Sequence, residues 1–228
     1  MSEEKKFGFI LIDKPVGPTS FSVVACLRRI TGIKKIGHAG TLDPFASGLL
    51  LCAIGREATR EIGQFVKLGK EYEADIFLGK STDTFDRQGS IREEYVGKKI
   101  KRKTVEAAVF SFLGKQKQIP PMFSAKKIGG RKLCDLARKG IEIERRPNEI
   151  EIYELKILRY SWPRLKIRIS CSSGTYIRSL ADDLGKKLGS GAHLTELRRT
   201  RINGYLVKKA VKLEKIKAEN WCKFLFLP

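Results

Sequence analysis

The chain has 228 residues, and its 46 Lys or Arg against 25 Asp or Glu give a formal net charge of +21. With 42% hydrophobic and 9% aromatic residues, the composition is that of a folded globular protein, which excludes disorder of the whole chain. A positive field of this size attracts polyanions, so nucleic acid is the expected partner.

No segment of the chain has the features of a membrane span or a secretory signal. The longest apolar stretches, such as residues 48–55, are far shorter than the roughly 20 residues that a bilayer crossing requires. The N-terminus lacks the charged, apolar and small-residue order of a signal peptide. The 5 cysteines are odd in number and form no CxxC pair, which indicates reduced thiols and no zinc site. We therefore expect a cytoplasmic protein without a membrane partner.

The N-terminal segment predicts a strand, a turn and a helix. Residues 7–12 (FGFILI) form an apolar run that ends at a turn rich in proline and glycine. An apolar stripe at helical spacing follows this turn. Ser20 or Ser22 is the expected N-cap of the helix, and Gly32 lies just beyond its end.

Two strands and a second helix are predicted next. Residues 49–54 (LLLCAI) are too short and too apolar for a surface helix and predict a strand buried on both faces. Residues 72–78 alternate between apolar and mostly acidic side chains, which predicts a half-buried strand. Thr104 is the expected N-cap of a helix with an apolar stripe that stops at Gly114.

The middle of the chain carries a large share of the positive charge. Residues 98–148 contain 15 Lys or Arg and 4 Asp or Glu, a local charge of +11. Prolines and paired glycines within this segment predict a protruding insertion at about residues 115–146, with one short helix around residues 133–138. The charge asymmetry indicates a binding face.

The C-terminal half predicts two antiparallel strands followed by a helix. Apolar residues alternate with charged ones around residues 150–152 and 165–171, and Trp162-Pro163 links the two strands. A helical apolar stripe then covers residues 177–188. The elements together predict an α/β (α+β) fold that combines strands and helices with a basic insertion.

The segment from Gly37 to Leu50 (GHAGTLDPFASGLL) is the most informative stretch of the chain. Its glycines allow the backbone to approach a ligand closely, and Pro44 stiffens the loop just after Asp43. A loop carboxylate that faces bound phosphates would repel them, so Asp43 at such a place requires a chemical purpose. An aspartate that only stabilises the turn fits the same pattern, and both interpretations stay open.

Arg178 lies in the segment SSGTYIR, between the clearest predicted strand and the clearest predicted helix. Loop residues at strand ends are where functional sites are commonly built. If the Arg178 side chain is partly buried it needs an anion, which Asp43 could supply. A solvated arginine, or one that contacts phosphate, fits the sequence equally well.

Five motifs occur together in one order along the chain. They are Lys14-Pro15, the Gly37–Leu50 segment, Lys70-Glu71-Tyr72, the GTYIR segment that ends at Arg178, and residues 191–199 (GAHLTELRR). In this combination the chain closely resembles the TruB-type tRNA pseudouridine synthases from about Phe7 to Arg199. The resemblance implies the pseudouridine synthase fold, a mixed, largely antiparallel sheet flanked by helices, in a single catalytic domain over residues 1–228. Residues 119–127 are similar to the family's RNA-gripping insertion.

The resemblance implies isomerisation of uridine 55 in the T loop of tRNA, without any cofactor or metal. The target base flips out of the loop, its N1–C1′ bond breaks, the base turns, and C5 joins C1′. By similarity Asp43 is the essential carboxylate, which either attacks C1′ or removes the C2′ proton to give a glycal. An adjacent Arg178 would favour the ionised form of Asp43 by opposite-charge attraction.

The resemblance also implies roles for residues around Asp43. Tyr72 matches a tyrosine that stacks on the flipped base, and Leu197 matches an apolar pocket residue, although both also fit as core residues. His38 matches a histidine that stacks on RNA. The residues expected to contact RNA are His38, Lys14, Lys126, Lys127, Arg131 and Tyr176. The expected partner is the T stem-loop of tRNA, and we expect a monomer.

Two features depart from the family pattern. Cys134 stands where many members have a tyrosine in the insertion helix, so one RNA contact is expected to be weaker. Only 29 residues follow Arg199, too few for the separate C-terminal PUA-type domain of many relatives, and no such domain is expected. RNA affinity should then depend on charge and fall steeply with salt.

Two alternative functions stay open. The first is a catalytically silent RNA-binding or RNA-folding module, and the joint presence of Asp43, Tyr72 and Arg178 argues against it. The second is a metal-dependent nuclease that uses Asp83 and Asp86 of the segment TDTFDRQG. This segment lacks the third acid and the distal Glu of a calcium loop, and activity undiminished by EDTA would remove the nuclease.

Overall fold

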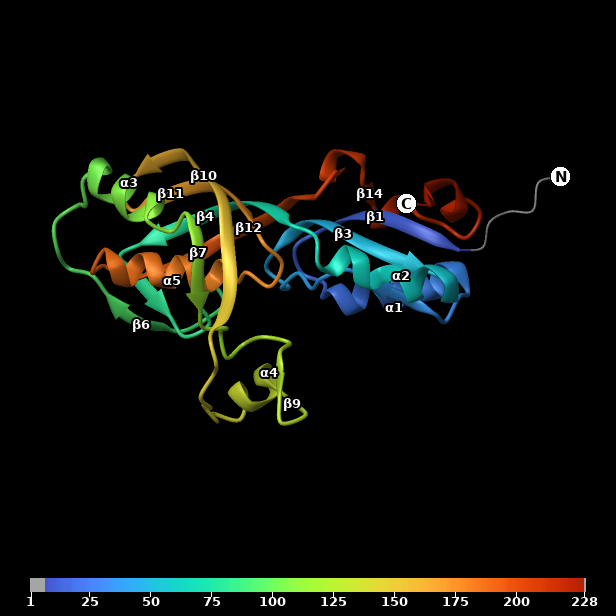
Figure 1. Cartoon of the computed structure of the whole chain (residues 1–228), viewed down its shortest axis with the longest axis horizontal. Coiled ribbons are helices and arrows are strands. Elements are labelled where there is room, and N and C mark those ends of the chain that lie inside the picture. The colour runs from blue at the N-terminus through green and yellow to red at the C-terminus, as the bar shows by residue number, and fades with distance from the viewer. Residues whose placement is uncertain (1–6, 228) are drawn as a thin grey trace. The chain divides into compact units, whose positions relative to one another are not determined.

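The computed structural model describes residues 7–227, which divide into two compact units (Figure 1). Unit 1 contains the chain up to Tyr72 together with the residues from Arg198 onward, and unit 2 contains Glu73–Leu197. Strands β4 (Lys70–Leu78) and β12 (Ala192–Ile202) each run from one unit into the other. The single catalytic domain expected over residues 1–228 remains a prediction.

Unit 1 combines two helices with a sheet. Its hydrogen-bonded strand order is β14-β1-β3-β12, with β2 paired to β3 and β13 paired to β12. Strands β1 and β3 are antiparallel, whereas β3 and β12 are parallel. The elements are β1 (Gly8–Lys14), α1 (Ser20–Thr31), β2 (Ile36–His38), β3 (Ser47–Ile54), α2 (Arg56–Val66), β13 (Tyr205–Leu206) and β14 (Val211–Lys212), with short 3-10 turns η1 (Val207–Lys209), η2 (Leu213–Lys215) and η3 (Trp221–Phe224).

Strand β3 is buried on both faces, as its sequence predicts. Because successive side chains of a strand point to opposite faces, Leu50 and Cys52 join one core cluster together with Leu27 of α1. Leu49 and Leu51 join a second cluster that includes residues of α2. The continuous apolar run therefore reflects a strand covered on both sides.

Helix α1 begins one residue earlier than its predicted caps allow. Thr19 is the N-cap, and its hydroxyl accepts a hydrogen bond from the Ser22 backbone N–H at 2.9 Å. The prediction of Ser20 or Ser22 as the cap is therefore wrong, because Thr19 supplies the same hydroxyl chemistry. Gly32 ends the helix with φ of 72°, as predicted.

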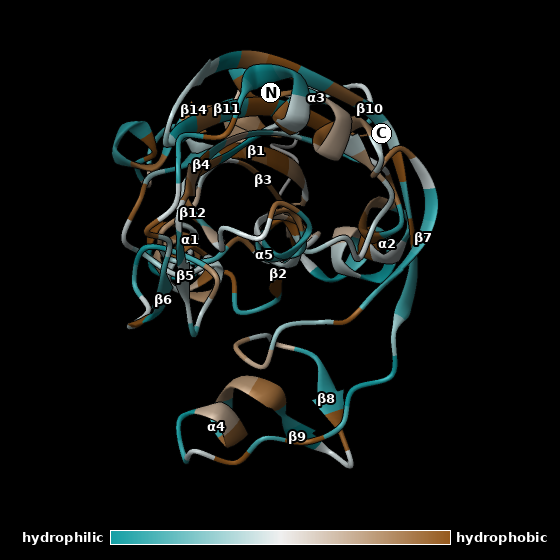
Figure 2. Cartoon of the chain, turned by 90° about the vertical axis from the view of Figure 1, so that its left-hand side faces the viewer, coloured by the Kyte–Doolittle hydropathy of each residue, from teal (hydrophilic) through white to brown (hydrophobic). Residues whose placement is uncertain are grey.

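Unit 2 is built on a sheet with strand order β12-β4-β11-β10-β7, in which β10 pairs antiparallel with both β11 and β7. The predicted strand pair is confirmed as β10 and β11, and the predicted helix that follows is α5. In Figure 2, α5 lies beneath the arch of β4, β11 and β10. The elements are β5 (Lys80–Thr82), β6 (Ile91–Glu94), α3 (Arg102–Phe110), β7 (Gly114–Gln118), β8 (Lys127–Ile128), β9 (Arg131–Lys132), α4 (Leu133–Ala137), β10 (Asn148–Ser161), β11 (Arg164–Cys171) and α5 (Ile177–Lys187).

Helix α3 differs from its prediction at both ends. It starts after Lys101, which makes no side-chain cap, so Thr104 lies inside the helix and does not cap it. The helix ends at Phe110 through a turn, and Gly114 opens strand β7. The predicted mixed sheet with flanking helices is confirmed, and within residues 7–227 no helix is long and apolar enough to cross a membrane.

The basic insertion stands apart from the sheet of unit 2. It follows β7 and returns to β10, and it contains the hairpin β8–β9 and helix α4 (Figures 1 and 2). Leu133 and Leu136 of α4 are buried, while most charged side chains of the segment are exposed. The predicted short helix is confirmed.

Candidate active site

Asp43 lies in a loop between β2 and β3 that the fold holds at several points. We call residues 40–48 the Asp43 loop. Ser20 of α1 exchanges two hydrogen bonds with Leu42, since its hydroxyl donates to the Leu42 carbonyl at 3.1 Å and accepts from the Leu42 N–H at 2.8 Å. The Asp43 side chain is only partly buried. The loop therefore presents a carboxylate on a backbone with little freedom.

Lys14 supports the turn that contacts this loop. Its Nζ donates to the carbonyls of Pro15 and Pro18, both at 2.9 Å. The same turn reaches the Asp43 loop, because the Gly17 N–H donates to the Pro44 carbonyl at 2.8 Å. The Lys14 ammonium therefore stabilises the turn after β1, and this turn holds Pro44, the residue next to Asp43, through a hydrogen bond.

Burial gives Lys14 unusual electrostatics. The side chain is 0% exposed, and this desolvation lowers the Lys14 pKa to about 8. The charge of Asp43 opposes the shift, and the charge of Arg199 adds to it. A fully buried amine that donates to backbone carbonyls does not fit the predicted RNA contact of Lys14. The Lys14 amine instead lies inside the fold and holds the turn after β1 through these hydrogen bonds.

His38 ends strand β2, two residues before the Asp43 loop. Burial lowers the His38 pKa, the charge of Arg199 lowers it further, and a backbone hydrogen bond with Gly40 opposes both effects. The ring is therefore neutral near pH 7. A neutral, half-buried imidazole is compatible with stacking on a base, and the RNA contact of His38 remains a prediction.

Arg199 is a buried residue of this site whose role the sequence motif does not reveal. It is 1% exposed, and its guanidinium donates to the Leu49 carbonyl at 2.7 Å and to the Gly40 carbonyl at 3.1 Å. The preceding Arg198 is partly exposed and pairs with Asp13 at 2.9 Å. Two adjacent arginines in a strand must face opposite sides, which is the only sequence signal for the burial of one of them.

Tyr72 and Leu197 are both buried, at 8% and 7% exposure. Tyr72 lies on β4 at the edge of unit 1, and Leu197 lies on β12 at the edge of unit 2. Burial of this degree fits a pocket wall as well as a core position. Their contacts with a flipped base therefore remain predictions.

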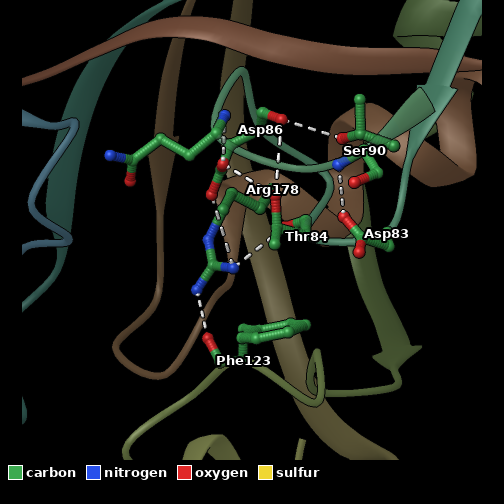
Figure 3. Close-up of polar contacts among 8 residues, drawn as sticks. Asp83, Thr84, Asp86, Ser90, Phe123 and Arg178 are labelled. Atoms are coloured by element: carbon green, nitrogen blue, oxygen red, sulfur yellow. Dashed lines mark hydrogen bonds and ion pairs between the residues drawn. The ribbon is translucent and has the colours of Figure 1, made fainter. Parts of the chain in front are cut away.

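Arg178, at the start of α5, is buried and contacts several residues of unit 2. It is 3% exposed, donates to the carbonyls of Thr84 at 3.0 Å and Phe123 at 2.6 Å, and lies 3.7 Å from the Asp86 carboxylate (Figure 3). A solvated or phosphate-contacting Arg178 is therefore excluded. The structure supplies Asp86 as an anion that the sequence does not single out as its partner, and the pair with Asp43 remains a prediction.

The two acids of the TDTFDRQG segment stabilise their own loop. Asp83 accepts a hydrogen bond from the Ser90 N–H at 2.9 Å, and Asp86 accepts from the Thr84 hydroxyl at 2.8 Å and the Gln88 N–H at 3.0 Å (Figure 3). Within residues 7–227 no group of three or more His, Cys, Asp or Glu could hold a metal ion. These contacts do not favour the nuclease alternative.

The residues of unit 2 that are predicted to contact RNA differ in exposure. Lys127 and Arg131 are exposed on the hairpin of the insertion and line a pocket of about 580 Å³. Lys126 is partly buried and donates to the Asn148 side chain at 2.6 Å. Tyr176 is half-buried at the N-terminus of α5. The two hairpin residues are thus the best placed for phosphate contacts.

Two family models together cover most of the chain. Residues 28–177 match the N-terminal domain of the TruB family pseudouridylate synthases, and residues 178–223 match the C-terminal domain of tRNA pseudouridylate synthase B. The tRNA pseudouridine synthase B of Protochlamydia amoebophila is 48% identical over 205 residues, which cover 90% of this chain and 77% of the relative. That of Chlamydia abortus is 47% identical over 214 residues, which cover 92% and 89%.

Solved structures agree with the family models. A Cbf5-Nop10-Gar1 complex matches with a TM-score of 0.72 at 32% identity over 92% of this chain. An H/ACA RNP bound to a substrate RNA containing 2′-deoxyuridine matches with a TM-score of 0.69 at 30% identity over 92% of this chain. This chain spans about half the length of those two chains, 54% and 52%. Because the N-terminal family model covers more than half of the residues, the chain belongs to the TruB family of pseudouridylate synthases.

Proposed function

We propose that the protein isomerises uridine 55 in the T loop of tRNA to pseudouridine, with Asp43 as the catalytic residue. The observation that carries this proposal is the Asp43 loop, in which a partly exposed carboxylate stands on a restrained backbone next to the buried Lys14. The curated relatives named tRNA pseudouridine synthase B support the choice of substrate. A rigidly held carboxylate is what a reaction at one ribose carbon requires.

The reaction rearranges one nucleotide and needs no external oxidant or reductant. The N1–C1′ bond breaks, the base turns, and a new C5–C1′ bond forms, after which C5 loses its proton and N1 takes up a proton, so that the product is an isomer of uridine. Asp43 either attacks C1′ or removes the C2′ proton to give a glycal, and both routes require its carboxylate to be ionised. Lys14 interacts electrostatically with Asp43, so one buried amine lies near the carboxylate.

The other predicted residues would hold the nucleotide. We propose that Tyr72 stacks on the flipped base, that Leu197 walls the pocket, and that a neutral His38 stacks on the RNA. Flipping costs a few kcal/mol, which contacts to the RNA backbone can offset. Lys127 and Arg131 of the insertion would make such contacts, since both are exposed and cationic.

The test of this function is to map the product on an unmodified tRNA transcript, with EDTA present. We expect one pseudouridine, at position 55, and none in a transcript that carries cytidine at that position. Tight, salt-sensitive binding without any pseudouridine would instead support the silent RNA-binding module. Modification at another uridine would keep the enzyme and overturn the proposed site.

Two further expectations accompany this proposal. We propose that the protein acts as a monomer in the cytoplasm on the T stem-loop of tRNA. Light scattering on a size-exclusion column tests the monomer, with and without tRNA. A dimer that persists at low protein concentration would contradict it.

A further inference from the structure

Arg199 is the largest side chain that is completely buried in residues 7–227, and its guanidinium reaches both ends of one loop. Its Nε donates to the Leu49 carbonyl at 2.7 Å and its Nη2 to the Gly40 carbonyl at 3.1 Å. Burial of a guanidinium is unfavourable unless its donors are satisfied. Gly40 is the first residue of the Asp43 loop and Leu49 follows its last residue, so the hydrogen bonds that satisfy the Arg199 guanidinium also hold the two ends of the loop.

The backbone of the loop is shaped to approach Arg199. Gly40 and Gly48 have φ of 105° and 103°, values that residues other than glycine adopt only with strain. A Cβ on Gly48 would lie 2.3 Å from the Arg199 carbonyl oxygen, and one on Gly40 would lie 3.6 Å from Arg199 Nη1. Strands β3 and β12 also pair Arg199 with Gly48 in register. The Gly40 end of the loop therefore faces the Arg199 guanidinium, and the Gly48 end packs against the Arg199 backbone.

We propose that Arg199 is a positioning residue that clamps the two ends of the Asp43 loop and so sets the place of the Asp43 carboxylate. This inference rests on the proposed function. Ser20 holds the middle of the loop from α1 through its two hydrogen bonds with Leu42, so Arg199 and Ser20 restrain it from different elements. A loop fixed at its ends and near its centre keeps the carboxylate in one orientation, and a displacement of about 1 Å can cost about 100-fold in rate.

Two substitutions separate the geometry of Arg199 from its charge. Arg199→Lys keeps the positive charge but loses the planar fork that reaches two carbonyls. Arg199→Met loses both. Because Arg199 lowers the Lys14 pKa, Arg199→Met should move the titration of the Lys14 ¹³Cε resonance above about pH 8, whereas Arg199→Lys should leave it near about pH 8. If Arg199 acts by positioning the loop, both variants should isomerise tRNA slowly, although only Arg199→Met should shift the titration of Lys14.

The decisive experiment measures single-turnover isomerisation of unmodified tRNA by a saturating excess of the protein, with binding of the same tRNA measured in parallel. For Arg199→Lys we expect the rate to fall by about 100-fold while the tRNA Kd changes by less than about threefold. Arg201→Met is the matched control, because Arg201 lies on the same strand and pairs with Glu71 at 3.1 Å, outside the loop. We expect its rate to stay within about threefold of wild type.

Three outcomes would overturn the inference. These are a rate for Arg199→Lys within about twofold of wild type, a loss of binding equal to the loss of rate, and an equal loss of rate in Arg201→Met. Absence of turnover by the wild type would remove the proposed function instead. If neither Arg199 variant folds, hydrogen exchange on the wild type decides, since the amides of Leu42 and Ala46 should exchange slowly, and fast exchange there would contradict a clamped loop.

Discussion

The Asp43 loop and the basic insertion both depend on lysine and arginine, but these residues are buried around the loop and exposed on the insertion. Around the loop, Lys14 of β1 and Arg199 of β12 are buried, and the charged group of each donates to backbone carbonyls. In the insertion, Lys127 and Arg131 are exposed on a two-stranded hairpin. Cations in the first region fix the backbone, whereas cations in the second remain available to a polyanion. Burial, and not residue type, therefore separates positioning from binding.

The largest effect should follow from filling the close approach at Gly48. Gly48→Ala would place a Cβ 2.3 Å from the Arg199 carbonyl oxygen at a φ of 103°. We expect the free energy of unfolding to fall by about 3 kcal/mol or more, from strain together with overpacking. Urea denaturation measures the change.

Gly63→Ala is the matched control for this substitution. Gly63 lies in α2, where an added Cβ would have no neighbour within 4 Å and the backbone φ is not positive. Alanine favours the helix, so this variant should gain about 1 kcal/mol. A Gly48→Ala protein as stable as wild type would show that the Asp43 loop can rearrange to accept a side chain. The loop would then be no more rigid than the insertion, which contradicts the comparison drawn above.

The next effect concerns the buried pair in unit 2. Asp86→Asn would remove the carboxylate charge that lies 3.7 Å from the buried Arg178 guanidinium. We expect a loss of about 3 kcal/mol in the free energy of unfolding, because a buried ion pair loses one of its charges. Thermal or urea denaturation measures the loss.

An exposed ion pair of the insertion provides the control for Asp86. Asp135 pairs with Arg138 at 3.4 Å, and both side chains are more than half exposed. Asp135→Asn should change stability by less than about 1 kcal/mol. Equal losses in the two variants would mean that burial does not distinguish the core of unit 2 from the insertion.

A smaller effect depends on pH. The Lys14 pKa is about 8 in the folded protein against 10.5 for an ordinary lysine, so between these values the unfolded chain holds a proton that the folded protein has released. The free energy of unfolding contributed by Lys14 therefore rises with pH across this window, by about 2 kcal/mol. Urea denaturation at several pH values, with Lys14→Met as the comparison, measures it.

The free energy of unfolding of the wild type, minus that of Lys14→Met, should increase from about pH 8 to about pH 10. Lys103→Met, which removes an exposed lysine of α3, should show no such trend. A difference that is constant with pH would contradict a desolvated Lys14.

The smallest effect on chemistry is expected in the insertion. Replacing Lys127 and Arg131 with glutamine should weaken tRNA binding and reduce the slope of log K against log salt by about 0.7 to 0.9 per lost phosphate contact. The rate at saturating tRNA should stay within about threefold. Lys208 and Lys209, both exposed on η1 and outside the basic segment of residues 98–148, form the control pair. An equal change of slope in both pairs would show a diffuse field and no specific insertion surface.

The strands and the main helices can be predicted because their periodicity is local. Strand β3 shows this well, since an apolar run of eight residues or fewer has few structures other than a strand buried on both faces. Helix α2 and strand β12 are not predicted from periodicity. Helix α2 has a mostly polar sequence, and β12 contains several arginines that the sequence alone would place on the surface.

The candidate site can be predicted only where a motif carries it. Asp43 stands in a glycine-rich loop that marks it as unusual. The buried partners of that loop, Lys14 and Arg199, look like two of many basic residues in a chain of net charge +21. Their burial depends on long-range pairing, such as the β3–β12 register, which no local pattern reveals. The Arg178–Asp86 contact, between residues far apart in sequence, escapes prediction for the same reason.

Asp43 is expected to perform the chemistry while exposed cations hold the RNA. This division of roles is tested most directly by the release of tritium from C5 of uridine in unmodified tRNA, for wild type and Asp43→Asn side by side in EDTA. We predict one tritium per tRNA from wild type, and a single-turnover rate at least about 1,000-fold lower in Asp43→Asn with unchanged tRNA binding. Release by Asp43→Asn at a rate near that of wild type would contradict the catalytic role of Asp43.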